Sequence, residues 1–242
     1  MEHFIDNDDS SLSLESVAVK IIKEGLSRAQ GDVQLACSFG VEDLVLIDLI
    51  SRFALEVGVF AIDTGRLPEE TYTVAEAVRE RYALTIHWFF PDRGAVEALL
   101  SEKGPFSFQQ SLENRQECCF IRKVEPLHRA LAPLAGWVTG MRREQSVTRA
   151  ALAVIEIDQA HDDRLKINPL IDWTEQQIWA YADQRRLPVN RLHRQGYPSI
   201  GCAPCTRAIL PGEDPRAGRW WWENPEHKEC GLHRRPVDDA TP

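Results

Sequence analysis

The sequence of 242 residues lacks the features of several special protein classes. No apolar run approaches the roughly 18 residues that a membrane helix needs, because the most apolar stretches, 44–50 and 84–90, contain Asp48 and His87. The first residues, MEHFIDNDDSS, are acidic and include no apolar segment of the kind found in signal peptides. Internal repeats and low-complexity segments are also absent. We therefore expect a globular, cytoplasmic protein that does not contact a membrane.

The chain also has no excess of positive charge. Its 28 Lys and Arg against 37 Asp and Glu give a net charge of −9. Residues 1–117 hold 10 basic and 21 acidic residues (−11), whereas residues 118–242 hold 18 and 16 (+2). Because nucleic-acid binding depends on excess Lys and Arg, we expect no nucleic-acid partner. A basic cluster in the second half could hold a small anion, although an acidic solvated face explains the asymmetry equally well.

Apolar segments of strand length and helix length alternate along the chain, which is typical of a doubly wound, mostly parallel α/β sheet. The pattern predicts strands at 33–37, 55–62, 83–90 and 137–140, an edge pair at 152–157 and 165–167, and helices at 14–26, 41–53, 68–82, 94–101, 110–134 and 174–185. The turns at 38–40, 63–66 and 139–143 should then share the edge where open α/β sheets bind ligands.

The composition changes at Thr206, after which the chain is rich in Pro, Gly and charge and has little periodicity. We expect residues 14–205 to form one α/β nucleotide-binding domain and residues 206–242 to form a mobile tail or lid. The run Trp220, Trp221 and Trp222 does not fit a fully disordered tail. At least one of these side chains should dock on the domain.

The first candidate ligand turn is formed by Ser38, Phe39 and Gly40, between a strand and a helix. Backbone N–H groups at a helix start bind phosphate, although any strand–turn–helix unit can look alike. This turn contains no Lys and no GxxxxGK motif, which excludes the usual triphosphate-binding loop. Glu42 and Asp43, which follow directly, would repel a highly charged phosphate tail. The ligand should carry modest negative charge at this turn.

The second candidate turn contains Asp63, Thr64, Gly65 and Arg66. Asp and Thr at the end of a strand can hydrogen-bond a base or a ribose. The same residue types also form ordinary Asx turns, which bind nothing. Both interpretations stay open for this segment.

A third candidate turn carries Arg142 and Arg143, with Arg149 close behind. It follows a strand and should lie on the same edge of the sheet. Arg side chains are suited to bidentate contacts with oxyanions. A solvated run of charge is the alternative.

Four of the six cysteines form two pairs, Cys118–Cys119 and the CxxC of Cys202 and Cys205. In a reducing compartment such pairs are more often metal ligands than disulfides, and four thiolates suit zinc or an iron–sulfur cluster. Adjacent residues on a helix point about 100° apart and rarely chelate one small ion, which favours a [4Fe-4S] cluster. Lys123 could direct positive charge toward that cluster. Two pairs of buried, small apolar side chains are the alternative.

The remaining cysteines have contrasting surroundings. Cys37 lies in an apolar strand, which indicates a structural role. Cys230 lies in a segment, 227–235, that contains two His, one Lys and two Arg, and such surroundings favour a reactive thiolate. A mobile element could carry this nucleophile into a pocket and then expose it to a second protein. An incidental tail thiol is the alternative.

Together these segments resemble the assimilatory adenylyl-sulfate (APS) reductases, relatives of the phosphoadenylyl-sulfate (PAPS) reductases. The motifs that carry the resemblance run in order over nearly the whole chain: SFGVED at 38–43, IDTGRLPEETY at 62–72, CC at 118–119, TGMRREQS at 139–146, INPLIDW at 167–173, GCAPCTR at 201–207 and ECGLH at 229–233. The resemblance implies a PP-loop fold, similar to the adenine nucleotide α-hydrolases. It also implies a [4Fe-4S] cluster with a structural or electrostatic role, bound by Cys118, Cys119, Cys202 and Cys205.

The resemblance further implies that Cys230 attacks the sulfur of APS, expels AMP and forms an S-sulfocysteine. Reduced thioredoxin, or glutaredoxin, would then release sulfite. The residues implied in substrate binding are Ser38, Phe39, Gly40, Asp63, Thr64, Gly65, Arg66, Lys123, Arg142, Arg143, Arg216, Arg219 and His233. The sequence does not fix the oligomeric state, and a homo-oligomer stays open.

Three other functions stay open from sequence. A PAPS or dual-specificity reductase is the nearest, but PAPS-specific relatives generally lack the four cluster cysteines. An iron–sulfur RNA sulfur-transfer enzyme is disfavoured because the SGGxDS-like loop of ATP-cleaving relatives is replaced by SFGVED. A nucleotide sensor that uses Cys230 as a redox switch is the non-enzymatic alternative.

Overall fold

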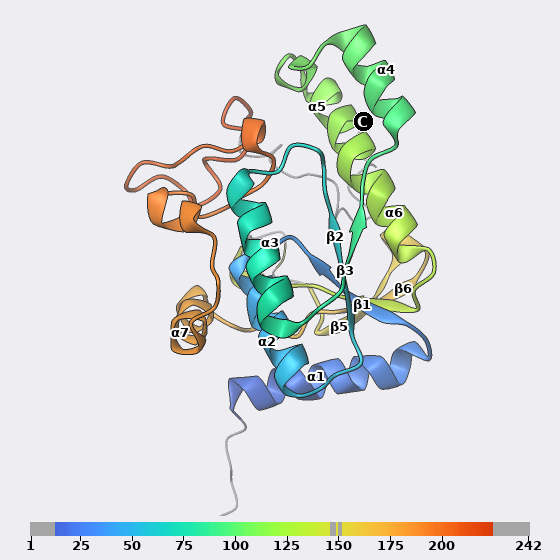
Figure 1. The fold of residues 1–242 in the computed structure, drawn as a ribbon, viewed down its shortest axis with the longest axis vertical. Helices are drawn as coiled ribbons and strands as arrows, with labels where there is room; N and C mark the ends of the chain where they lie inside the picture. The colour runs from blue at the N-terminus through green and yellow to red at the C-terminus, as the bar shows by residue number, and fades with distance from the viewer. Residues whose placement is uncertain (1–12, 146–148, 150–151, 225–242) are drawn as a thin grey trace, which may run out of the picture.

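The computed structural model of the chain describes residues 13–145, 149 and 152–224 (Figure 1). Its centre is a six-stranded sheet in the order β3-β2-β1-β4-β6-β5. The strands are β1 Val33–Cys37, β2 Gly58–Ile62, β3 Ile86–Phe89, β4 Gly136–Val138, β5 Ile155–Asp158 and β6 Arg164–Ile167. Neighbouring strands are parallel apart from the antiparallel pair β5 and β6. The predicted doubly wound, mostly parallel sheet and its edge pair are therefore confirmed.

The strand order reverses between β1 and β4. From β1 the chain proceeds through β2 to β3 on one side, whereas β4 is followed by β6 and β5 on the other. At such a reversal the connections leave toward opposite faces of the sheet, and a crevice opens at the carboxyl ends of the two strands. The turns 38–40 and 139–143 follow these two strands directly, so the fold places them at this crevice.

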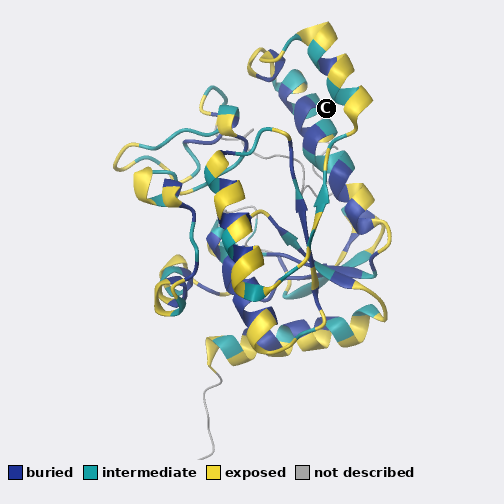
Figure 2. Cartoon of the chain, in the orientation of Figure 1, coloured by how far each residue is buried: buried dark blue, intermediate teal, exposed yellow. Residues whose placement is uncertain are grey.

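Helices cover both faces of the sheet (Figure 1). The α-helices of the described residues are α1 Leu14–Ala29, α2 Val41–Arg52, α3 Glu69–Tyr82, α4 Arg93–Lys103, α5 Leu112–Cys119, α6 Glu125–Leu131 and α7 Glu175–Arg185. The main core joins α1, α2, α3 and α7 to one face, and a smaller core joins α6 to the other. Figure 2 shows the buried residues gathered on the strands and on the inward sides of these helices. No helix within the described ranges is long and apolar enough to span a bilayer.

The long helix expected at 110–134 contains an irregularity. Residues 112–131 are helical throughout, but Phe120–Val124 form a π-helical turn between α5 and α6. In this turn the N–H of Glu125 donates to the carbonyl of Phe120, five residues earlier. Pro126 has no N–H and cannot complete the regular α-helical ladder at this point. Such π turns are frequent at functional sites, and this one follows Cys118–Cys119 directly.

The segment after Cys205 contains a docked tryptophan, as expected. Trp220 is 1% exposed and packs in the cluster that includes the four paired cysteines. Thr206 and Arg219 form an isolated antiparallel bridge. Glu223 forms a buried ion pair with Arg115 of α5, with Nε and Oε1 2.9 Å apart. Residues 206–224 are thus fastened to the domain, and the division of the chain at residue 206 stays a prediction.

Candidate functional site

A cleft of about 430 Å³ opens at the crevice between β1 and β4. This volume lies within the usual range for small-molecule sites. All three predicted turns contribute to its walls, through Ser38–Gly40, Thr64 and Thr139 with Arg142. The prediction that these turns share one edge of the sheet is therefore confirmed.

A buried carboxylate holds the first turn in place. The backbone N–H and the hydroxyl of Ser38 both donate to Oδ2 of Asp43, at 2.6 and 2.8 Å. Phe39 has a left-handed backbone (φ 62°) and its ring stacks on Trp88 at 5.5 Å. Burial raises the pKa of Asp43 from 3.8 to about 6, although the Ser38 hydrogen bonds oppose part of this shift. Asp43, which is buried in the wall of the cleft, therefore shapes the loop that begins α2.

The second turn divides between two environments. Asp63 accepts hydrogen bonds from the N–H of Gly65 at 2.7 Å and from the Tyr72 hydroxyl at 2.9 Å, which is the Asx turn that the sequence left open. The Arg66 guanidinium lies 5.0 Å from the centre of the Phe108 ring, beside the paired cysteines. Of the four residues of this turn, all of them described, Thr64 alone lines the cleft. Substrate contacts by the other three stay predictions.

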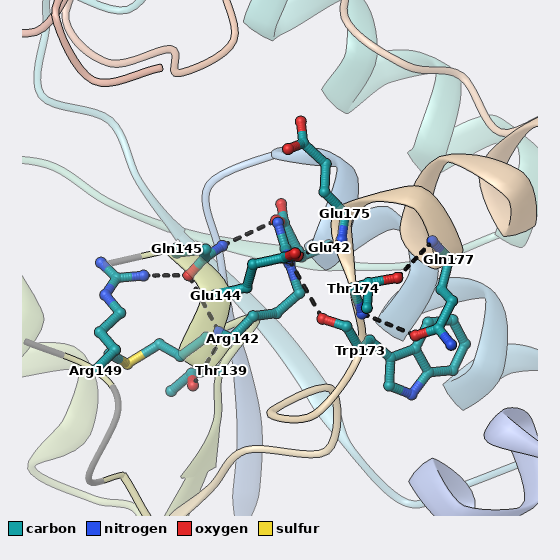
Figure 3. Close-up of polar contacts among 11 residues, drawn as sticks. Glu42, Thr139, Arg142, Glu144, Gln145, Arg149, Trp173, Thr174, Glu175 and Gln177 are labelled. Carbon is teal, nitrogen blue, oxygen red and sulfur yellow. Dashed lines mark hydrogen bonds and ion pairs between the residues drawn. The ribbon is translucent and has the colours of Figure 1, made fainter. Parts of the chain in front are cut away.

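The two adjacent arginines of the third turn point in different directions. Arg142 is 5% exposed and lines the cleft, where its Nε lies 3.0 Å from Oε1 of Glu42 (Figure 3). Arg143 instead pairs with Asp172 and donates to the carbonyl of Leu152 at 2.9 Å. Within the described part of the chain, Arg143 is not among the residues that line the cleft. Its predicted role as an anion ligand is not supported by this placement.

The two cysteine pairs, more than 80 residues apart in sequence, meet in space. Cys118 and Cys119 end α5, whereas Cys202 precedes a short 3-10 turn, Ala203–Cys205, that ends with Cys205. All four thiols are reduced and at most 9% exposed. They line a small cavity together with cations and two aromatic rings, namely Arg66, Arg115, Arg122, Lys123, Phe108 and Trp220.

The thiols of this cavity differ in acidity. Burial raises the pKa of Cys118, and raises that of Cys205 to about 12 with help from the nearby Cys202. Burial opposes ionisation of Cys202 as well, but the charge of Lys123 and the hydrogen bond with Thr64 lower its pKa below that of an ordinary thiol. Sγ of Cys202 and Oγ1 of Thr64 are 3.2 Å apart, so the Thr64 hydroxyl can donate to the sulfur once it is ionised. Of these three thiols, Cys202 is therefore the one whose pKa favours the thiolate.

The chemistry of this cavity fits an anionic group held by thiolates. Four soft sulfur donors face the positive charge of Arg66, Arg122 and Lys123. Within the described residues, Nε of Arg122, Nε of Arg219 and Nε1 of Trp220 are buried and have no hydrogen-bond partner. Buried polar atoms of this kind usually find a partner, so the surroundings suit a further acceptor. No three His, Cys, Asp or Glu side chains of the described segments are arranged to hold a single metal ion.

The cysteine cavity and the cleft adjoin each other. Lys123, Cys202 and Trp220 line both of them. Arg216 and Arg219, which the sequence also predicts as anion ligands, line the cleft together with Lys123. With Arg142, the structure thus brings four predicted cationic ligands into one cleft, beside the four thiols. Cys230 and His233 lie outside the described residues, and their roles stay predictions.

A family model described as "Phosphoadenosine phosphosulfate reductase domain" matches residues 32–208. The chain belongs to this family. Membership confirms the family predicted from the sequence and, with it, the assignment of the chain to the enzymes of that family. In this chain, the matched span begins just before β1 and ends just after the CxxC of Cys202 and Cys205.

Two relatives of this chain are named adenosine 5′-phosphosulfate reductase. The protein of Allochromatium vinosum is 50% identical over 234 residues, which cover 97% of this chain and 91% of that protein. The protein of Burkholderia cepacia is 54% identical over 201 residues, which cover 83% of this chain and 80% of that protein.

Solved structures confirm the predicted PP-loop fold. A PAPS reductase from Candida auris is 28% identical, has a TM-score of 0.67 and covers 79% of this chain and 90% of its own. An FMN adenylyltransferase from Candida glabrata, 16% identical, has a TM-score of 0.53 and covers 98% of this chain and 84% of its own. The second similarity shows the fold alone.

Several residues that line the cleft were not predicted from the sequence. Asn190, His193 and Ser199 reach it from the irregular segment after α7. The Asn190 side chain donates to Oγ1 of Thr71 at 3.4 Å, and burial lowers the pKa of His193. This segment has no periodic pattern that would show which side chains point inward. The sequence showed the charge of Glu42 but not its partner, because Arg142 lies 100 residues away in sequence.

Proposed function

We propose that this protein is an assimilatory APS reductase, which reduces adenylyl sulfate to sulfite and AMP with electrons from thioredoxin or glutaredoxin. The contiguity of the cationic cleft with the four-thiol cavity, through Lys123, Cys202 and Trp220, is the observation that carries the proposal. Two relatives that are about half identical in sequence, both named adenosine 5′-phosphosulfate reductase, also support the proposal. A PAPS reductase or a dual-specificity enzyme is the alternative.

We propose that Cys118, Cys119, Cys202 and Cys205 hold a [4Fe-4S] cluster. When bound, the cluster would supply a compact centre of negative charge and a structural link between α5 and the segment after α7. Lys123 borders this cavity and also lines the cleft, so its ammonium group can bind a substrate anion while it offsets thiolate charge. The residues that position the nucleotide are then those of the Ser38–Gly40 turn and Thr64.

The chemical steps require few groups of the protein. Lys123, Arg216 and Arg219 would bind the phosphosulfate and offset its charge. The Cys230 thiolate attacks the sulfur, an S–S bond forms, and the S–O bond breaks with its electron pair on the departing AMP. A thioredoxin thiolate then attacks Sγ of the S-sulfocysteine, and sulfite leaves with the electrons of the S–S bond. The second thioredoxin thiol resolves the mixed disulfide and restores Cys230.

Sulfite release from APS and from PAPS, with reduced thioredoxin, is the direct test. We expect a clear preference for APS. Intact mass after mixing with APS alone should show a sulfonate adduct, and peptide mapping should place it on Cys230. Cys230→Ser should lose the adduct and turnover while it still binds AMP. Normal turnover by this variant, or an adduct on another cysteine, would contradict the proposal.

A further inference from the structure

Trp220 is the point at which the segment after Cys205 returns to the cysteine cavity. It has a left-handed backbone (φ 41°), which is unfavourable for a bulky residue and persists only where the surroundings hold it. Its N–H donates to the carbonyl of Cys205 at 3.1 Å, and the residue is 1% exposed. Trp220 lines both the cysteine cavity and the cleft. The groups that hold it in place therefore act on both sites.

Arg115 of α5 is one of these groups. Its guanidinium carbon lies 4.8 Å from the centre of the Trp220 ring, which is a cation–π distance. Its Nε and Nη2 donate to the two carboxylate oxygens of Glu223 at 2.9 and 3.1 Å, so the ion pair is bidentate. The two side chains are 1% and 8% exposed. Arg115 thus fastens the chain on the far side of Trp220 to a helix that carries two of the cysteines.

Arg219, which lines the cleft, contacts the same indole ring. Its guanidinium carbon lies 4.7 Å from the ring centre. The guanidinium also packs on the backbone of Gly201, where an added Cβ would lie 2.3 Å from Nη2 of Arg219. Nη1 donates to the Ser199 hydroxyl at 3.3 Å. The place of this cation in the cleft therefore depends on the place of the Trp220 ring.

These contacts connect the cysteine cavity to the cleft. We propose that Arg115 is a positioning residue, which fixes Trp220 through its pair with Glu223 and thereby places Arg219 to bind the phosphosulfate. The inference rests on the proposed function, in which Arg219 is an anion ligand. Arg115 lines the cysteine cavity and is not among the described residues that line the cleft, so it acts on the substrate only through its neighbours.

Binding tests the inference independently of turnover. The dissociation constants of APS and of adenosine are measured by calorimetry on the full-length Cys230→Ser protein, the parent protein, which does not react with APS. Adenosine lacks the phosphosulfate and reports on the rest of the cleft. In this parent, Glu223→Gln keeps the shape of the side chain but removes its charge. The affinity for APS should fall about tenfold or more, the scale of one charge-assisted hydrogen bond, and that for adenosine should stay unchanged.

Hydrogen exchange of the backbone follows the segment itself. In Glu223→Gln, peptides that cover residues 217–224 should exchange about tenfold faster or more, because the hydrogen bond from the Trp220 N–H opens more often. Glu223→Asp keeps the charge and should restore part of the APS affinity.

The matched control is Glu213→Gln. It removes the charge from another bidentate pair of the same segment, in which Arg207 donates to both oxygens of Glu213 at 2.9 Å. Neither of these residues is among those that line the two cavities. This variant should leave the APS affinity and the exchange of residues 217–224 unchanged. A loss of APS affinity equal to that of Glu223→Gln would overturn the role assigned to Arg115.

The outcomes distinguish the inference from the proposed function. If the parent protein binds APS no more tightly than adenosine, the proposed function fails. If it prefers APS and Glu223→Gln weakens both ligands equally, or neither, the function stands and the inference is overturned. Iron that is lost in step with APS affinity also overturns the inference, because the pair would then serve the cysteine cavity alone.

Should Glu223→Gln fail to fold, as judged by thermal unfolding, Arg115→Lys is measured instead. It keeps the positive charge but cannot form the bidentate pair, so it should weaken APS binding and spare adenosine. An unchanged affinity for APS overturns the inference.

Discussion

The cysteine cavity and the Glu42–Arg142 side of the cleft are both rich in charge, but they differ in how many of their polar groups have a hydrogen-bond partner. Around Arg142, the charges and amides are paired with other groups of the chain (Figure 3). Around the cysteines, buried donors of Arg122, Arg219 and Trp220 have no partner in the described segments. The paired groups need no ligand to satisfy them, whereas buried donors without a partner suit the binding of an acceptor.

Replacement of one paired cysteine should have the largest effect and would break the comparison on the cysteine side. In protein purified without oxygen, Cys205→Ser should lose most of its iron and acid-labile sulfide, because three thiolates cannot ligate every iron of a cube. Cys37→Ser is the matched control, since Cys37 is also buried but lies in β1, outside the cysteine cavity. Wild-type protein that carries stoichiometric zinc and no iron would refute the cluster.

Removal of the cation shared by the two cavities should have the next largest effect. Lys123→Ala should lower kcat/KM for APS about a hundredfold or more, because a positioned cation contacts the charge that develops on the leaving phosphate. Lys123→Arg should restore part of this loss. Steady-state kinetics of both variants should be compared with Arg79→Ala, which alters an exposed pair on α3. If Lys123→Ala matches wild type, the phosphosulfate does not bind at the cysteine side of the cleft.

The buried Asp43 predicts a dependence of stability on pH. Its folded pKa of about 6 lies above the ordinary 3.8, so the folded chain holds this proton more tightly. The resulting stabilisation is complete below about pH 4 and is lost as the pH rises through 6. At about 1.4 kcal/mol per pKa unit, this is about 2 to 3 kcal/mol, and Asp43→Asn should remove it. Urea unfolding between pH 4 and 7 measures both proteins, and parallel pH profiles would show that Asp43 does not titrate in this range.

The smallest effect is expected at the start of α7. Thr174 and Gln177 form a capping box, with Thr174 Oγ1 accepting from the Gln177 N–H at 3.2 Å. Thr174→Ala should lower the free energy of unfolding by about 1 kcal/mol in urea. The affinity for AMP should be retained, because this cap lies beside the Glu42–Arg142 pair without being part of it. A parallel loss of AMP affinity would show that the first turn of α7 responds to the ligand.

Local patterns account for what the sequence predicted well. The strand 33–37 and the helix expected at 174–185 follow from local patterns, and the structure contains both. Residue type likewise indicated that the two cysteine pairs would act together. The strand expected from residue 83 instead begins at Ile86, because Ala83 has a left-handed backbone (φ 50°) that ends α3.

Contacts between distant segments account for the rest. Arg142 and Arg143 are equivalent in sequence, and only the packing of the turn against Glu42 and Asp172 separates their roles. Asn190 and His193 belong to a short 3-10 helix, Arg191–Gln195, and its cap, which are too short for a periodic pattern to mark their inward side chains. The position of the Ser38 loop depends on a hydrogen bond that its N–H donates to the buried carboxylate of Asp43, which no local rule distinguishes from an exposed one.

The π turn at Phe120–Val124 lets one continuous helical stretch direct its side chains toward two different parts of the protein. Upstream of it, Cys118 and Cys119 must face the thiol cavity, and downstream, Leu127 and Leu131 must face the sheet. At 3.6 residues per turn, deletion of a single residue there would rotate one half against the other by about 100°. The π turn therefore sets the rotation of the first half of the helix relative to the second, so the positions of the Cys118 and Cys119 sulfurs depend on how the second half packs on the sheet.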